Sequence, residues 1–218
     1  MRNKLIHYTL GEEIFSAVTH GLGALFGVAA LVYMVVMSAL GHAPLAVVSS
    51  AIYGATLIIL FTMSTLYHAI SNKKAKLVFR VLDHTTIFLL IAGTYTPIAL
   101  VSLHGALGWT IFGVQWGVAA LGITLNAISI EKFKVFSMIG YIVSGWMILI
   151  AALPMYHAMD IRGIWWLVLG GVLYTVGIIF YALKKIKYMH SVWHIFVLLG
   201  AVAHFFCIAF YVLPTIYH

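Results

Sequence analysis

Histidine, serine and aspartate side chains recur near the ends of several apolar segments of this 218-residue chain. They are Ser64 and His68, then Asp83, then His190 and His194. Each of the two pairs has a spacing of four residues, which in a helix places both side chains on one face with Cβ atoms about 5–6 Å apart. Imidazoles placed in this way can bind one metal ion, and a carboxylate or hydroxyl beside them can hold a water molecule.

The segments that carry these residues are long and apolar. The chain is 64% hydrophobic and 8% charged, whereas soluble proteins have about 25% charged residues. About 20 apolar residues in a helix cross the hydrocarbon core of a membrane. We therefore predict an all-α fold, an integral membrane bundle of seven transmembrane helices in a single domain over residues 1–218, with a short segment, about 1–13, before the first helix. The predicted helices are 14–40, 46–70, 79–103, 107–130, 135–154, 162–183 and 190–214.

Lysine and arginine residues predict the orientation of the bundle, because cytoplasmic connections carry an excess of them. Of the twelve, only Arg162 falls between spans five and six. The other eleven precede span one or follow spans two, four and six: Arg2, Lys4, Lys73, Lys74, Lys76, Arg80, Lys132, Lys134, Lys184, Lys185 and Lys187. We expect a multi-pass protein of the cell (plasma or inner) membrane, with its N-terminus in the cytoplasm and its C-terminus outside. Clusters between spans indicate topology and predict no nucleic-acid partner.

The directions of the spans bring the polar residues to one side of the membrane. Span two ends in the cytoplasm with Ser64 and His68, and spans three and seven begin there with Asp83, His190 and His194. We predict a zinc ion (Zn²⁺) bound by the three histidines, with a water in the fourth position as in catalytic zinc sites. Asp83 is predicted to accept a hydrogen bond from that water or from an imidazole, and Ser64 to orient the water or a substrate carbonyl. The alternative is that the histidines form hydrogen bonds between helices or meet lipid headgroups.

Other polar residues have simpler interpretations. Asp83 can form a salt bridge with Arg80, one turn earlier, without losing the role above. Glu13 and His20 fit an acid at a helix start and an interfacial histidine. His204 is about 15 Å beyond the last histidine pair along the helix, so we expect it to form a hydrogen bond with a neighbouring helix. The remaining histidines are expected near the interface: His7, His42, His84, His104, His157 and His218.

Three motifs taken together resemble a known family. They are Glu13-x2-Ser16-x3-His20, then Ser64-x3-His68 followed by Arg80-x2-Asp83, and then His190-x3-His194 with His204 beyond. In this order the motifs resemble the progestin and adipoQ receptors (PAQR), in particular their bacterial haemolysin III branch, over nearly the whole chain. The resemblance implies zinc on His68, His190 and His194, with Ser64 and Asp83 holding its water. Ser16 and Ser191 depart from an asparagine and a proline of the family pattern, which weakens inference about the substrate more than about the metal.

The function expected from these features is zinc-dependent hydrolysis of a membrane lipid. Eukaryotic relatives and the similar alkaline ceramidases imply an amide substrate such as ceramide, so we expect a lipid amide or ester reached from within the bilayer. Zinc would polarise the carbonyl, Asp83 would act as general base and Ser64 would help hold the oxyanion. The alternatives are a non-enzymatic regulator of membrane lipid or energy homeostasis, a pore-forming haemolysin with structural zinc, and a proton-coupled transporter that uses His20, Asp83 and His204.

Overall fold

The computed structural model describes residues 8–183 and 185–214, which are helical with short connections. Seven helical spans in this part of the chain are long and apolar enough to cross a membrane, so the predicted all-α bundle is confirmed. The spans are α1 (Leu10–Leu40), α2 (Pro44–Ala69), α3 (Lys73–Pro97) continued by η1 (Ile98–Leu103), α4 (Gly105–Ile128), α5 (Ile130–Gly145) continued by η2 (Met147–Ala151) and α6 (Ala152–Ala158), α7 (Ile161–Ala182), and α8 (Met189–Cys207) continued by η3 (Ile208–Val212).

Three of the helices begin before the apolar segments that predicted them, because polar N-cap residues start the helix earlier. In α1, the backbone N–H of Thr9 donates to Oε2 of Glu12 at 2.8 Å, which is one half of a capping box. Asn72 caps α3, which begins at residue 73 rather than 79, and Ser129 caps α5, which begins at residue 130 rather than 135. The extra turns carry charged residues that the hydropathy pattern placed in connections.

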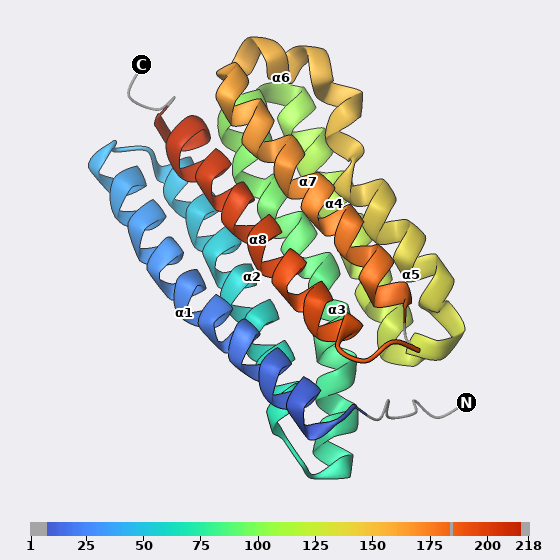
Figure 1. Ribbon diagram of the computed structural model, residues 1–218. Coiled ribbons are helices and arrows are strands. Elements are labelled where there is room, and N and C mark those ends of the chain that lie inside the picture. The colour runs from blue at the N-terminus through green and yellow to red at the C-terminus, as the bar shows by residue number, and fades with distance from the viewer. Residues whose placement is uncertain (1–7, 184, 215–218) are drawn as a thin grey trace.

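The third span lies at the centre of the bundle (Figure 1). In its most apolar part 78% of the residues are buried, against 22–28% in the spans of α1, α4, α5 with α6, and α7. α3 packs against α2, α4 and α5, while α8 packs against α1 and α7. Large apolar side chains cover the outer surface, among them Leu22, Leu25, Val32, Ile139 and Trp165, as expected where hydrocarbon is the solvent.

The fifth span is broken where α5 gives way to η2, and side chains from other helices satisfy the backbone groups at the break. The hydroxyl of Tyr95 donates to the carbonyl of Gly145 and accepts from the N–H of Ile148, both at 2.8 Å. The side-chain amide of Gln115 donates to the carbonyl of Ser144, also at 2.8 Å. Such partners are needed because a bilayer offers no water to unpaired backbone groups.

The basic residues of the connections gather at one end of the bundle. Because successive spans alternate in direction, the connections after α2, α4 and α7 lie at the end where α1 begins (Figure 1). Arg162 lies at the opposite end, where its guanidinium lowers the pKa of Asp160 to about 2. Arg2, Lys4 and Lys184 lie outside the described residues. That the basic end faces the cytoplasm stays a prediction from the sequence.

Candidate metal centre

Three histidines from α2 and α8 converge at the basic end of the bundle. Nε2 of His190 lies 3.3 Å from Nε2 of His68 and 3.1 Å from Nε2 of His194. The potential ligand atoms of all three lie within 4.8 Å of one another. His68 is in the last turn of α2, and the other two are one turn apart at the start of α8. The antiparallel packing of the bundle therefore brings together residues that are 122 positions apart.

The spacing of these nitrogens fits a tetrahedral metal ion. Two imidazole nitrogens bound to zinc at about 2.0–2.1 Å are about 3.3–3.4 Å apart when the geometry is tetrahedral. Hydrogen bonds alone would account for fewer of the contacts, because one N–H on His190 can make a linear hydrogen bond to only one of its two neighbours. A cation can accept a lone pair from each of the three rings.

Glu13 holds His68 in the orientation that such a site requires. Its Oε2 accepts a hydrogen bond from Nδ1 of His68 at 2.7 Å, and its Oε1 accepts one from Nζ of Lys76 at 2.6 Å. Because the proton is on Nδ1, the lone pair on Nε2 of His68 points to the other two histidines. Metal-binding histidines commonly have such a carboxylate partner. Glu13 lies in the first turn of α1, as expected from the sequence. Its hydrogen bond with His68 was not predicted.

The start of α1 also fixes the start of α8. Oε1 of Glu12 accepts a hydrogen bond at 2.7 Å from the backbone N–H of Tyr188, the residue before α8, which has a left-handed φ of 65°. The hydroxyl oxygens of Ser16 and Ser191 are 3.1 Å apart and buried. These serines are the two positions that depart from the family pattern, so the two departures contact each other between α1 and α8.

Aromatic rings stack on two of the three histidines, His190 and His194. His20 stacks on His194 with ring centroids 3.8 Å apart and donates through Nε2 to the carbonyl of His194 at 3.3 Å. His20 is only 3% exposed, so it lies inside the bundle and not at the interface as expected. Tyr8 stacks on His190 with centroids 4.7 Å apart, and burial raises the pKa of its phenol. Both rings restrict the orientations of the candidate ligands.

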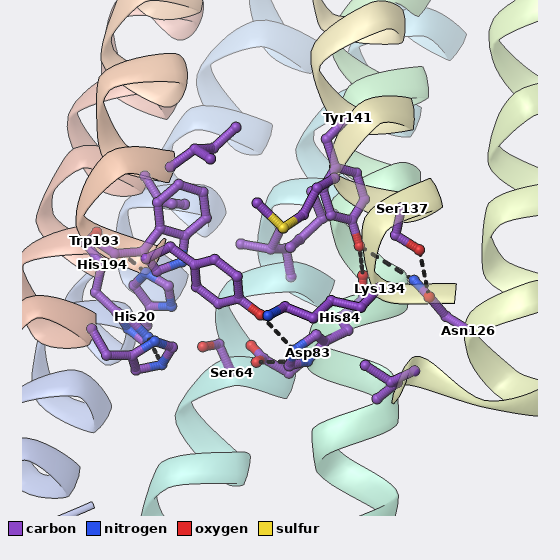
Figure 2. A pocket seen from close by; sticks show the side chains of 18 residues that line it. His20, Ser64, Asp83, His84, Asn126, Lys134, Ser137, Tyr141, Trp193 and His194 are labelled. Carbon is purple, nitrogen blue, oxygen red and sulfur yellow. Dashed lines mark hydrogen bonds and ion pairs between the residues drawn. The ribbon is translucent and has the colours of Figure 1, made fainter. Parts of the chain in front are cut away.

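A cavity of about 50 Å³ adjoins the histidines and has room for a few water molecules. Its lining includes His190 as well as Ser64, Asp83 and His194, which are labelled in Figure 2. The hydroxyl of Ser64 is buried and has no hydrogen-bond partner among the described residues. A buried polar atom of this kind is costly unless it binds a water or ligand, so Ser64 is placed to hold an oxygen atom inside the cavity.

The salt bridge that the sequence allowed between Asp83 and Arg80 is not formed. Instead, Nη1 of Arg80 donates to Oε1 of Glu131 at 2.6 Å, because the polar first turn of α5 brings a carboxylate against α3. Oδ2 of Asp83 lies 3.6 Å from Nδ1 of His84. The interfacial position expected for His84 is also wrong, since its ring lines the cavity and its Nε2 accepts a hydrogen bond from the hydroxyl of Tyr181 at 3.4 Å.

A second, mostly apolar cavity of about 90 Å³ adjoins the first on the side toward the middle of the bundle. It reaches Trp146 and Tyr174, and His204 lines it. Nε2 of His204 donates to the carbonyl of Leu167 in α7 at 3.1 Å, so the hydrogen bond expected between helices is confirmed. Six residues line both cavities: Leu60, Ile87, Tyr141, Ile178, Trp193 and Val197.

Comparison with known proteins identifies a family that covers most of the chain. The family described as "Haemolysin-III related" matches residues 8–205. Hemolysin-3 of Bacillus cereus is 42% identical over 204 residues, which cover 94% of this chain and 93% of that protein. The Hemolysin-3 homolog of Bacillus subtilis (strain 168) is 42% identical over 204 residues, 94% of this chain and 96% of that protein. The human Monocyte to macrophage differentiation factor is 30% identical over 167 residues, 74% of this chain and 69% of that protein.

Proposed function

We propose that this chain, which belongs to the haemolysin-III-related family of multi-pass membrane proteins, is a zinc-dependent hydrolase that cleaves an amide or ester bond of a membrane lipid. The proposal is carried by one arrangement. The three imidazoles converge, and two of them, His190 and His194, line one cavity together with the Asp83 carboxylate and the Ser64 hydroxyl, which has no hydrogen-bond partner among the described residues. With a metal ion bound, these groups can activate a water molecule, accept its proton and stabilise an oxyanion, which are the steps of metal-assisted hydrolysis of a carbonyl compound.

His68, His190 and His194 would hold the ion through their Nε2 atoms, and Glu13 would keep His68 in the required tautomer. Three neutral nitrogen ligands are typical of a catalytic zinc site, whereas structural sites have four protein ligands. When bound, zinc supplies a Lewis acid that polarises a carbonyl and lowers the pKa of a water molecule.

Asp83 and Ser64 would handle the proton and the developing charge. The Asp83 carboxylate accepts a proton from the attacking water and returns it to the leaving nitrogen or oxygen. The Ser64 hydroxyl donates a hydrogen bond to the carbonyl oxygen as negative charge develops on it. Both side chains line the cavity that contains His190 and His194, so the two roles fall within one space.

The second cavity gives a place for the hydrocarbon chain of the substrate. It adjoins the first, with which it shares six lining residues, and is lined mainly by apolar side chains. An acyl chain in this cavity would place its carbonyl carbon near the histidines, with its tail toward Trp146 and Tyr174. Burial of each CH₂ group contributes about 0.8 kcal/mol to binding.

The experiment is a lipid-hydrolysis assay on purified protein in nanodiscs, with zinc content measured in the same samples. The substrates are ceramides, N-acyl amino lipids and phospholipids, and the proteins are wild type and Asp83→Asn. We expect wild type to release fatty acid from at least one class of lipid. Asp83→Asn should retain zinc, but its rate of hydrolysis should fall by a factor of about 100 or more.

The contrary outcome of this assay is equally clear. If zinc-loaded wild type releases no fatty acid from any of these lipids, the hydrolase proposal fails. The relatives' name, hemolysin, suggests pore formation as the alternative. Lysis of red cells or ion flux into liposomes that persists at the same level in Asp83→Asn would then favour that function.

A further inference from the structure

The cavity beside the histidines has a second polar wall, formed by α4 and α5. Asn126, Lys134 and Ser137 line it. In Figure 2 the side chain of Lys134 extends from α5 into the space that Asp83 and His84 line from α3. Lys134 is half-buried, so it differs from the exposed basic residues Lys74 and Lys132 in the first turns of α3 and α5.

The groups around Lys134 leave its positive charge without a carboxylate partner. The nearest acid in its own helix, Glu131, is one turn earlier and pairs with Arg80 at 2.6 Å. Asp83 faces His84, with 3.6 Å between Oδ2 and Nδ1. Lys134 itself forms no ion pair with the acidic side chains that the structure describes. A cation that reaches into a protein cavity in this way favours an anionic ligand over a neutral one.

The neighbouring amides and hydroxyls do not compete for that ligand. Ser137 donates to Oδ1 of Asn126 at 2.7 Å, and Asn126 donates to the hydroxyl of Tyr141 at 3.3 Å. Tyr141 in turn donates to the carbonyl of His84 at 2.8 Å. These three side chains are therefore engaged with one another, which leaves Lys134 as the donor for a charged group on the substrate.

The two adjoining cavities match an amphiphile with its charge at one end. The apolar cavity suits the acyl chain, the histidines, Asp83 and Ser64 surround the scissile carbonyl, and Lys134 lies on the remaining wall. The cavity beside the histidines is small, about 50 Å³, and Lys134 is the one lysine or arginine among its lining residues, so it suits a carboxylate better than a bulkier and more highly charged phosphate ester.

We propose that Lys134 selects lipid amides whose head group carries a carboxylate a few atoms from the amide, that is, N-acyl amino acids, over neutral amides such as ceramide. This inference rests on the proposed hydrolase function. In the reaction the amide C–N bond breaks and a C–O bond forms from water. Both protons of the water end on the amine, so the products are a fatty-acid carboxylate and a zwitterionic amino acid.

The test compares two lipids of matched size, N-oleoylglycine and N-oleoylethanolamine, of which only the first is charged. Binding is measured in the slow Asp83→Asn background with and without Lys134→Met, which removes the charge but keeps the apolar stem. We expect the Asp83→Asn protein to bind N-oleoylglycine about tenfold more tightly than N-oleoylethanolamine, the effect of one charge-assisted hydrogen bond. Adding Lys134→Met should abolish this preference, and Lys134→Arg should retain it.

The two proposals are separated by measuring hydrolysis with the Lys134 variants that keep Asp83. With Asp83 intact, Lys134→Met should lose the preference for N-oleoylglycine while its zinc content and melting temperature stay at wild-type levels. A preference that is absent in the parent protein, or that survives Lys134→Met, overturns the role of Lys134. If no protein releases fatty acid but the binding preference follows Lys134, the hydrolase proposal fails while the carboxylate site stands.

Discussion

Glu13 accepts a hydrogen bond at 2.7 Å from Nδ1 of His68, although the two residues are 55 positions apart in the chain. The contact joins the first turn of α1 to the last turn of α2. Lys76 in α3 completes the chain of contacts by donating to the other oxygen of Glu13 at 2.6 Å. Three helices therefore determine the orientation of one candidate ligand, His68. Substitution of Glu13 tests this arrangement.

Replacing Glu13 with glutamine should weaken metal binding. The amide lacks the negative charge that makes the imidazole a stronger ligand, and such changes around metal sites typically reduce affinity about 10- to 100-fold. The measurement is zinc affinity of the purified protein by competition with a chelator. Asp160→Asn is the matched control, because Asp160 is also an ionised carboxylate in an ion pair but lies at the opposite end of the bundle. Equal affinities of Glu13→Gln and wild type would contradict the orienting role.

Replacing Tyr95 with phenylalanine should destabilise the fold without changing its shape. The hydroxyl serves two backbone groups at the break in the fifth span, the carbonyl of Gly145 and the N–H of Ile148. Without the hydroxyl these two buried backbone groups lack a partner, which should lower the free energy of unfolding by about 1–3 kcal/mol. Thermal melting in detergent measures the effect, and Tyr156→Phe, at a residue that is 61% exposed, serves as control. If the two variants have the same melting temperature, Tyr95 does not stabilise the break in the fifth span.

Replacing Gly108 with alanine should disturb the packing of α4 on η1. The added Cβ would collide with the backbone carbonyl of Ala99, which cannot move aside as a flexible side chain could. Overpacking of this kind lowers the free energy of unfolding by about 1–3 kcal/mol. Gly113→Ala in the same helix is the matched control, since its Cβ would meet nothing within 4 Å. The account expects a lower melting temperature for Gly108→Ala only, and equal melting of both variants would count against this close approach.

The spans could be predicted from the sequence because hydrocarbon imposes a simple rule, about 20 apolar residues per helix. The predicted residues 46–70 and 162–183 correspond to Pro44–Ala69 and Ile161–Ala182. The early starts at Lys73 and Ile130 follow from caps, which act outside the apolar run. The π-helix that follows Pro97 was not predicted, because a proline in the sequence marks an irregularity in a helix but not the form that the next turn takes.

The candidate site could be predicted only in part. Spacing and helix direction were enough to bring His68, His190 and His194 to one end of the bundle. The partners of Glu13 and Arg80 were not predicted, because they depend on how α1 and α5 are rotated against their neighbours. The apolar faces of these helices are broad in a membrane protein, so hydropathy does not fix that rotation.

Metal analysis of the purified protein tests the central claim most directly. Atomic emission should find close to one zinc ion per chain in wild type and in the control His157→Ala, whose side chain is exposed in the short helix α6. The His190→Ala, His194→Ala double variant, purified in folded form, should have lost it, because a single histidine cannot hold the ion. Wild type without near-stoichiometric zinc, or a double variant that retains it, would contradict the assignment of this site.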